Sequence, residues 1–175
     1  MSTTTSVPAG TYGLDSVHSS IGFAVKYNGL TKFRSTFEKY DAALADGVLT
    51  GSADVSSIAV DEPNFKGHLL TADFFDAENA PTITFKSSDI SVAEDGTAEV
   101  TGDLTIRGTT KQVVAKGEFA PGQDAFGNDR AQFELTTTVD RREFGINWQN
   151  QLPNGNDALD WNVEISVSLT LVKQA

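Results

Sequence analysis

Residues 160–172 read D-W-N-V-E-I-S-V-S-L-T-L-V, and apolar side chains alternate with polar ones through this stretch. Because successive side chains of a β-strand point to opposite sides, a period of two predicts a strand with one dry and one wet face. A helix would mix the two sets of side chains within two turns. The predicted dry face carries Trp161, Val163, Ile165, Val167, Leu169 and Leu171.

The same alternation recurs along the chain, which is typical of an all-β protein. It is clearest at 129–139, 97–107 and 20–26, and weaker at 11–16, 34–44, 48–59, 81–91 and 111–119. Turn-forming sequences separate these stretches: Asp46-Gly47, Asp95-Gly96, Gly108-Thr109 and the segment 121–129. The pattern predicts eight or nine strands of about ten residues each.

Strands of this number and length favour a closed antiparallel barrel over a sandwich. Ten residues of strand extend over about 30 Å, which suits strands that run at a tilt around a barrel. An eight-stranded barrel is wide enough to be filled by side chains or to hold one small ligand. The expected fold is therefore an eight-stranded antiparallel β-barrel.

Few segments depart from the strand pattern. One short helix is expected at 62–70, with Asp61 as its N-cap and Pro63 in its first turn. Residues 144–158 show neither period and predict a long surface loop. We expect residues 1–10 to be a flexible N-terminal segment and residues 11–173 to form a single barrel domain.

The composition fits one globular domain with a dry interior. Of the 175 residues, 39% are hydrophobic and 21% are charged, and 11 Phe outnumber the three Tyr and two Trp. Phe has no polar group, so it suits the lining of a dry space. The net charge of −11 argues against a nucleic-acid partner and against adhesion to an anionic bilayer, since both need clustered Lys and Arg.

The sequence also bears on location. The start, M-S-T-T-T-S-V-P-A-G, lacks the basic and apolar regions of a secretory signal, and no stretch approaches the roughly 20 apolar residues of a membrane helix. There is no Cys and therefore no disulfide. We expect a cytoplasmic protein, the alternative being a secreted or periplasmic chain whose leader has been removed.

Residues suited to catalysis or metal binding are scarce. The two histidines, His18 and His68, are far apart in the chain, so we expect no metal and no cofactor. Asp15, His18 and Ser19 have the composition of a catalytic triad but lie within five residues, and we interpret them as shaping a turn. The run Asp140-Arg141-Arg142-Glu143 could clamp an anion, but we favour an ion-pair corner that joins a strand to a loop.

Five motifs occur in a fixed order. They are G-x-Y-x-L-D-x-x-H-S-x-I-x-F-x-V at 10–25, H-L-L-x-x-D-F-F-D at 68–76, P-x-I-x-F-x-S at 81–87, G-D-L-T-I-R-G-x-T at 102–110 and D-R-R-E-F-G-I at 140–146. Together they closely resemble the YceI-like family of lipid-binding, lipocalin-like barrel proteins, over about residues 10–172. The resemblance implies an extended eight-stranded barrel with a helix at one side, and a lumen that holds a long aliphatic chain. It also implies a possible homodimer.

The chain departs from this family at one position beside the first motif. Where the family usually carries a His after the F-x-V strand, this chain has Tyr27. The resemblance therefore leaves room for a different polar end on the ligand.

Three functions are compatible with the sequence. The first is binding of an apolar, lipid-like ligand (polyisoprenoid, isoprenoid quinone or fatty-acid derivative) for carriage, storage or sequestration. The second is an isomerase or cyclase that uses a buried acid or phenol such as Asp15, Tyr27 or Tyr40, and the third is a barrel with a solid core. For the first, the expected ligand-binding residues are Phe23, Val25, Phe37, Phe75, Phe85, Phe133, Trp148 and Trp161, with Trp148 near an opening and the others facing inward.

Overall fold

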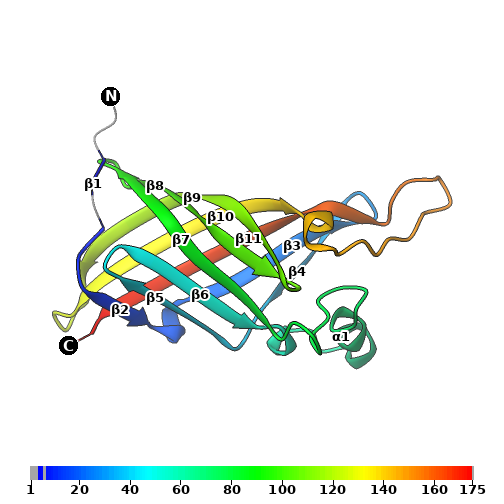
Figure 1. Cartoon of the computed structure of the whole chain (residues 1–175), viewed down its shortest axis with the longest axis horizontal. Coiled ribbons are helices and arrows are strands. Elements are labelled where there is room, and N and C mark those ends of the chain that lie inside the picture. The colour runs from blue at the N-terminus through cyan, green and yellow to red at the C-terminus, as the bar shows by residue number, and fades with distance from the viewer. Residues whose placement is uncertain (1–3, 6, 175) are drawn as a thin grey trace.

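The computed structural model describes residues 4, 5 and 7–174, which form a β-barrel with one α-helix at one end (Figure 1). The strands are β1 (Thr4–Thr5), β2 (Thr11–Leu14), β3 (Ser20–Tyr27), β4 (Thr31–Thr36), β5 (Tyr40–Ala45), β6 (Val48–Asp54), β7 (Thr82–Ala93), β8 (Thr97–Ile106), β9 (Thr109–Gln123), β10 (Asp129–Asp140) and β11 (Leu159–Lys173). The helix α1 spans Pro63–Leu69, and short 3₁₀ turns occupy η1 (Ser16–His18), η2 (Val55–Ser57) and η3 (Arg141–Phe144).

The sheet closes on itself, which confirms the predicted eight-stranded antiparallel barrel with a short helix. The hydrogen-bonded order is β10-β9-β8-β7-β6-β5-β2-β11, and β11 pairs again with β10 to complete the ring. The pairing of β10 with β11 is long, running from Arg130↔Val172 to Asp140↔Asn162. At the end that carries α1, β3 replaces β2 as the neighbour of β11, and β4 pairs with β3.

The stretch 34–44, expected as one strand, is divided between β4 and β5. The two parts have different neighbours, because β4 pairs with β3 whereas β5 pairs with β2 and β6. At the break, the Ser57 hydroxyl accepts the backbone N–H of Lys39 at 2.9 Å and donates to the backbone oxygen of Asp54 at 2.6 Å. The same contacts explain why β6 ends at Asp54, short of the predicted 59.

Helix α1 lies within the predicted 62–70, but its cap is one residue later than expected. The Glu62 carboxylate, not that of Asp61, accepts the backbone N–H groups of Asn64 and Phe65. Pro63 occupies the first turn, where its missing N–H leaves no hydrogen bond unmade. The helix and the segment that follows it cover one side of the barrel end (Figure 1).

Of the N-terminal segment 1–10, residues 1–3 and 6 lie outside the described residues. Within the described part, β1 pairs with β7 through Thr4↔Ala93 and Thr5↔Val92.

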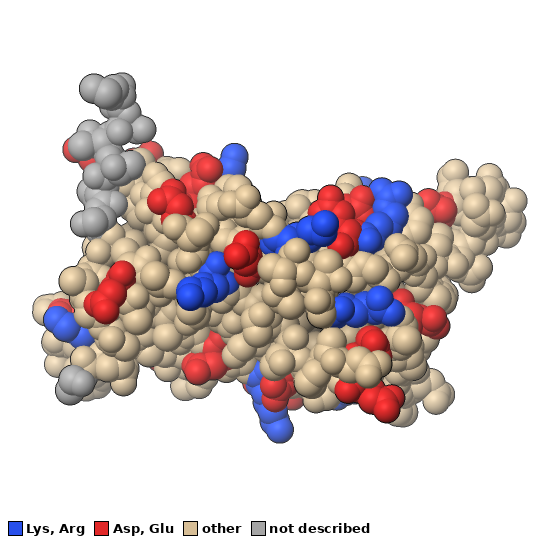
Figure 2. Space-filling model, viewed as in Figure 1, with Lys and Arg blue, Asp and Glu red and all other residues tan. Residues whose placement is uncertain are grey.

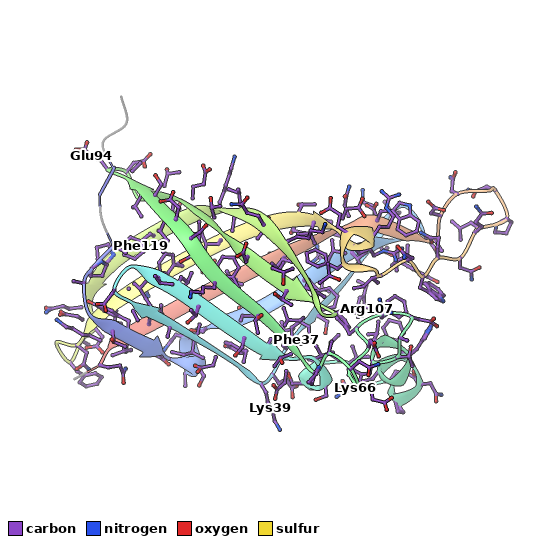
Figure 3. All side chains as sticks on the ribbon, in the orientation of Figure 1. Phe37, Lys39, Lys66, Glu94, Arg107 and Phe119 are labelled. Atoms are coloured by element: carbon purple, nitrogen blue, oxygen red, sulfur yellow. The ribbon has the colours of Figure 1, made fainter. Side chains whose placement is uncertain are left out.

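The interior falls into two halves along the barrel axis. The half in which β2 begins and β11 ends holds a closely packed cluster of Tyr12, Ala42, Leu44, Leu49, Val92, Ala98, Val100, Phe119, Ala131, Phe133, Leu135, Leu169 and Leu171. The half that carries α1 holds a second, more aromatic cluster, which includes Phe37, Phe74 and Phe144. Figure 3 shows Phe119 and Phe37 in these two halves.

An ion-pair network holds the ends of strands together at the packed half. The Arg130 guanidinium donates to the Asp15 carboxylate at 2.8 Å and to the Asp124 carboxylate at 2.9 Å. The Asp15 carboxylate also contacts His18 Nδ1 at 2.9 Å, and the Ser19 hydroxyl donates to the Asp15 backbone oxygen at 2.7 Å. These contacts shape the η1 turn, in agreement with the structural interpretation of Asp15, His18 and Ser19.

We expect the Asp15 contacts to stabilise the fold at neutral pH and not in strong acid. Hydrogen bonds from Arg130 and then His18 lower the pKa of Asp15 from 3.8 to about 2. A carboxyl whose pKa is lower in the folded state stabilises that state above its unfolded pKa, and loses this contribution as the pH falls through the folded pKa. Asp15→Asn should therefore lower the urea midpoint of unfolding at pH 7, with the difference shrinking between about pH 4 and pH 2.

Asp103→Asn serves as the control for this prediction. Asp103 is exposed on β8 and takes part in no ion pair within the described chain. An Asp15→Asn deficit of the same size at pH 2 as at pH 7 would contradict the ionic origin of the effect.

Candidate functional site: an apolar cavity at one end of the barrel

The half of the barrel that carries α1 encloses a cavity of about 670 Å³. Pockets that hold small ligands in proteins have volumes of about 300–1,000 Å³ and mainly apolar walls. The walls here are formed by residues of nine strands, β3 to β11, together with α1 and its following segment. The aliphatic part includes Ile21, Val25, Leu69, Ile83, Leu104, Ile106, Val113, Val139, Ile146, Leu159, Val163, Ile165 and Val167.

The alternation of each strand places these side chains in the cavity. Along β11, Val163, Ile165 and Val167 line it, whereas Glu164 and Ser166 between them are exposed. Figure 2 shows acidic and basic side chains interspersed over the outer surface of the barrel. The odd and even positions of the strand therefore meet two different environments, as the sequence predicted.

A cluster of five phenylalanines lies where β3 and β4 face α1. Phe23 is central, with ring centroids about 6 Å from Phe33, Phe37 and Phe75, mostly in edge-to-face geometry. Phe65 of α1 adds an edge-to-face contact with Phe33 at 5.2 Å. All five side chains line the cavity.

A second aromatic group lies at the same end, around His68. The His68 ring packs edge-to-face on Phe74 at 5.0 Å and on Trp148 at 5.5 Å, and its Nε2 contacts the Asp73 carboxylate at 3.0 Å. His68, Phe74 and Trp148 all line the cavity, and His68 is partly exposed. With the exposed Tyr27 also in the lining, these residues mark the opening at the end that carries α1.

Gly102 of β8 makes room for one of the predicted ligand-binding side chains. A Cβ atom at this position would lie 2.5 Å from Cζ of Phe85, so no larger residue fits beside the ring. The Phe85 ring thereby packs against β8 at Gly102 and forms part of the cavity wall. The glycine of the fourth sequence motif is thus explained by packing.

Six of the eight predicted ligand-binding residues line the cavity: Phe23, Val25, Phe37, Phe75, Phe85 and Trp148. Phe133 faces the interior but lies in the packed half, where its ring contacts Phe119 at 4.9 Å between centroids. Contact of these eight residues with a ligand remains a prediction.

Trp161 is expected from the sequence to face inward, but it is not part of the cavity lining. The guanidinium carbons of Arg141 and Arg142 lie 4.2 and 4.6 Å from the centre of its ring, and its Nε1 donates to the Asp157 carboxylate. The cause is a shift in the pairing of β11 with β3 between Leu159 and Val163, which interrupts the alternation at Trp161.

Arg141 is buried and holds the loop 145–158 against the barrel. Its guanidinium donates to the backbone oxygens of Asp160 (2.9 Å), Ile146 (2.9 Å), Trp148 (2.7 Å) and Leu159 (3.3 Å). Burial lowers the pKa of Arg141 from its ordinary value.

Arg142 beside it is exposed and forms an ion pair with Asp140 at 2.6 Å. The run 140–143 is therefore a corner between strand and loop, as we favoured. The clamp by Arg141 on backbone oxygens was not predicted, because nothing in the sequence shows which of the two arginines turns inward.

The ionisable groups of the lining are all basic or phenolic. Lys32, His68, Arg141 and Tyr27 line the cavity, and none of the lining residues within the described chain is an Asp or a Glu. Of the other residues considered for catalysis, Asp15 is paired with Arg130 in the packed half and Tyr40 is outside the lining. Burial raises the pKa of Tyr40.

Among the residues that the structure describes, no group of three or more His, Cys, Asp or Glu side chains is arranged to hold a metal ion. No helix in the same residues is long and apolar enough to span a membrane.

A closed eight-stranded antiparallel barrel with an apolar cavity open at one end belongs to the class of β-barrels whose interior has room for one small ligand. Residues 12–171 match the model of the YceI-like domain, and the chain belongs to this family. A UPF0312 protein of Vibrio cholerae serotype O1 is 36% identical over 137 residues, covering 74% of this chain and 72% of the relative. A UPF0312 protein of Pseudomonas putida is 30% identical over 167 residues, covering 90% and 82%.

Solved structures share the fold. A YceI protein of Campylobacter jejuni superposes with a TM-score of 0.72 at 20% identity, covering 93% of this chain and 97% of that one. A polyisoprenoid-binding domain of Saccharophagus degradans superposes with a TM-score of 0.71 at 13% identity, covering 93% and 98%. At these identities the likeness concerns the fold.

Proposed function

We propose that the cavity holds one apolar, chain-like molecule, a polyisoprenoid, an isoprenoid quinone or a fatty-acid derivative, for carriage, storage or sequestration. The supporting observation is the cavity of about 670 Å³ with aliphatic and aromatic walls and no acidic side chain among its described lining residues. The polyisoprenoid-binding domain with the same fold supports the ligand class. We assign no catalytic step to the cavity.

Burial of the tail supplies the affinity in this proposal. Each methylene-sized group removed from water contributes about 0.8 kcal/mol. Ten such groups contribute roughly 8 kcal/mol before the cost of association, so a tail of moderate length accounts for useful binding. The polar end of the ligand would remain near Tyr27, Lys32 and His68, which line the cavity at its open end.

Blocking the cavity should abolish uptake of the ligand. In Ile165→Trp the larger side chain enters the middle of the cavity wall, and we expect at least a tenfold loss of affinity for geranylgeraniol added to protein freed of lipid. The measurement is isothermal titration calorimetry, because the substitution adds a third Trp to the chain and so changes the intrinsic fluorescence.

Glu164→Trp is the matched control, because Glu164 is the neighbouring residue on β11 and is exposed on the outer face. It introduces the same side chain and should leave the affinity within about twofold of the unmodified protein. Equal affinity of the two variants would place the binding site outside the cavity.

A further inference from the structure

The packed half of the barrel gives the cavity a fixed floor. Ala42, Leu49, Val100, Leu135 and Leu169 belong both to the packed cluster and to the cavity lining, so they separate the two halves. Beyond them lie side chains that are at most 5% exposed and do not line the cavity: Tyr12, Leu44, Val92, Ala98, Phe119, Ala131, Phe133 and Leu171.

The cavity lining ends at a similar level on different strands. On β10 the cavity lining stops at Leu135, and the next inward residue, Phe133, is 1% exposed. On β8 it stops at Val100, before Ala98, which is also 1% exposed. Side chains from several strands therefore fill the cross-section of the barrel, and a tail that enters at the open end meets a wall.

The volume above this floor limits the length of the ligand tail that can be buried. A water-sized group occupies about 30 Å³ in a liquid, so a cavity of 670 Å³ holds roughly twenty carbon-sized groups. A tail of about forty carbons would need about twice that space. Its far half would remain in water or would have to displace the packed side chains.

We infer that this barrel selects its ligand by tail length, with full burial limited to about twenty carbons by the floor under Leu135 and Phe133. The inference rests on the proposed function and narrows its ligand class to tails of three or four isoprene units or fatty-acyl length. Shortening a tail below the limit loses buried surface, while lengthening it beyond the limit adds none.

The test measures the affinity of lipid-free protein for linear prenols of about ten, twenty and forty carbons. We expect affinity to rise at least tenfold from ten to twenty carbons, and to change less than about threefold from twenty to forty. A tenfold or greater rise from twenty to forty carbons would overturn the length limit and leave the proposed function standing. Binding of none of the prenols would overturn both.

Two truncations locate the floor. Phe133→Ala and the milder Leu135→Ala remove side chains at the floor and should raise affinity for the forty-carbon prenol at least fivefold relative to the twenty-carbon one. Ile58→Ala is the control, because Ile58 is also 1% exposed but belongs neither to the packed cluster nor to the cavity lining, so its truncation should leave this ratio unchanged. An unchanged ratio in a folded Phe133→Ala or Leu135→Ala protein would contradict the assigned floor.

Discussion

Phe133→Asp should leave the domain unfolded or close to unfolding at room temperature. Phe133 is 1% exposed in the middle of the packed half and contacts Phe119. Truncation of a buried Phe alone costs about 3–5 kcal/mol, and an unpaired carboxylate adds a penalty for its lost hydration. The sum of at least about 5 kcal/mol is comparable to the whole free energy of unfolding of an ordinary domain.

Urea denaturation followed by circular dichroism measures this loss. Phe126→Asp makes the same exchange at a Phe that is 89% exposed, and should change the free energy of unfolding by less than about 0.5 kcal/mol. Similar midpoints for the two variants would show that Phe133 is not enclosed, and would also contradict the assigned floor of the cavity. Because the expected effect is on folding, loss of ligand by Phe133→Asp would not by itself locate the binding site.

Arg141→Met should release the loop 145–158 from the barrel. The substitution keeps an apolar stem but removes the donors to four backbone oxygens, including those of Ile146 and Trp148. Leaving buried polar groups without partners costs about 1–3 kcal/mol for each, less where water can enter. We expect a loss of at least about 3 kcal/mol in the free energy of unfolding or of local opening.

Hydrogen exchange distinguishes local opening from global unfolding. Amide protection should fall in the loop first, and ligand affinity should fall with it, because Ile146 and Trp148 line the cavity. Arg142→Met is the matched control: its guanidinium is half exposed and pairs with Asp140, so it should cost no more than about 1 kcal/mol. Equal protection in both variants would contradict the role of Arg141.

The fold was predictable because most strands keep one side chain in the interior and the next outside. The run through Val163, Ile165 and Val167 indicates a strand, and the Phe content indicates a dry interior. Where a strand changes register, the prediction weakens. In β7 the pairing with β8 shifts between Ser87 and Asp89. Before the shift an odd-numbered residue, Phe85, faces inward, and after it an even-numbered residue, Ile90, does, so the alternation is interrupted.

The sequence predicts an apolar interior, but not where in the barrel that interior is hollow. The sequence shows which face of a strand is dry, but not whether the space beside it is filled. Phe85 and Phe133 look alike in their strands, yet one lines the cavity and the other fills the packed half. That difference depends on side chains from many strands that meet at one level of the barrel. The sequence of a single strand does not show which side chains it will meet. His68 was missed as a lining residue because its helix offers no alternation to interpret.

The central claim is that the cavity encloses an apolar chain. The most direct measurement is electron density in crystals of protein that has been purified and crystallised without detergent, after addition of a twenty-carbon prenol. We expect continuous, elongated density that starts near Tyr27 and His68, passes Phe23 and Ile165, and stops above Leu135. A cavity that contains ordered water instead, or whose walls have closed together, would contradict the claim.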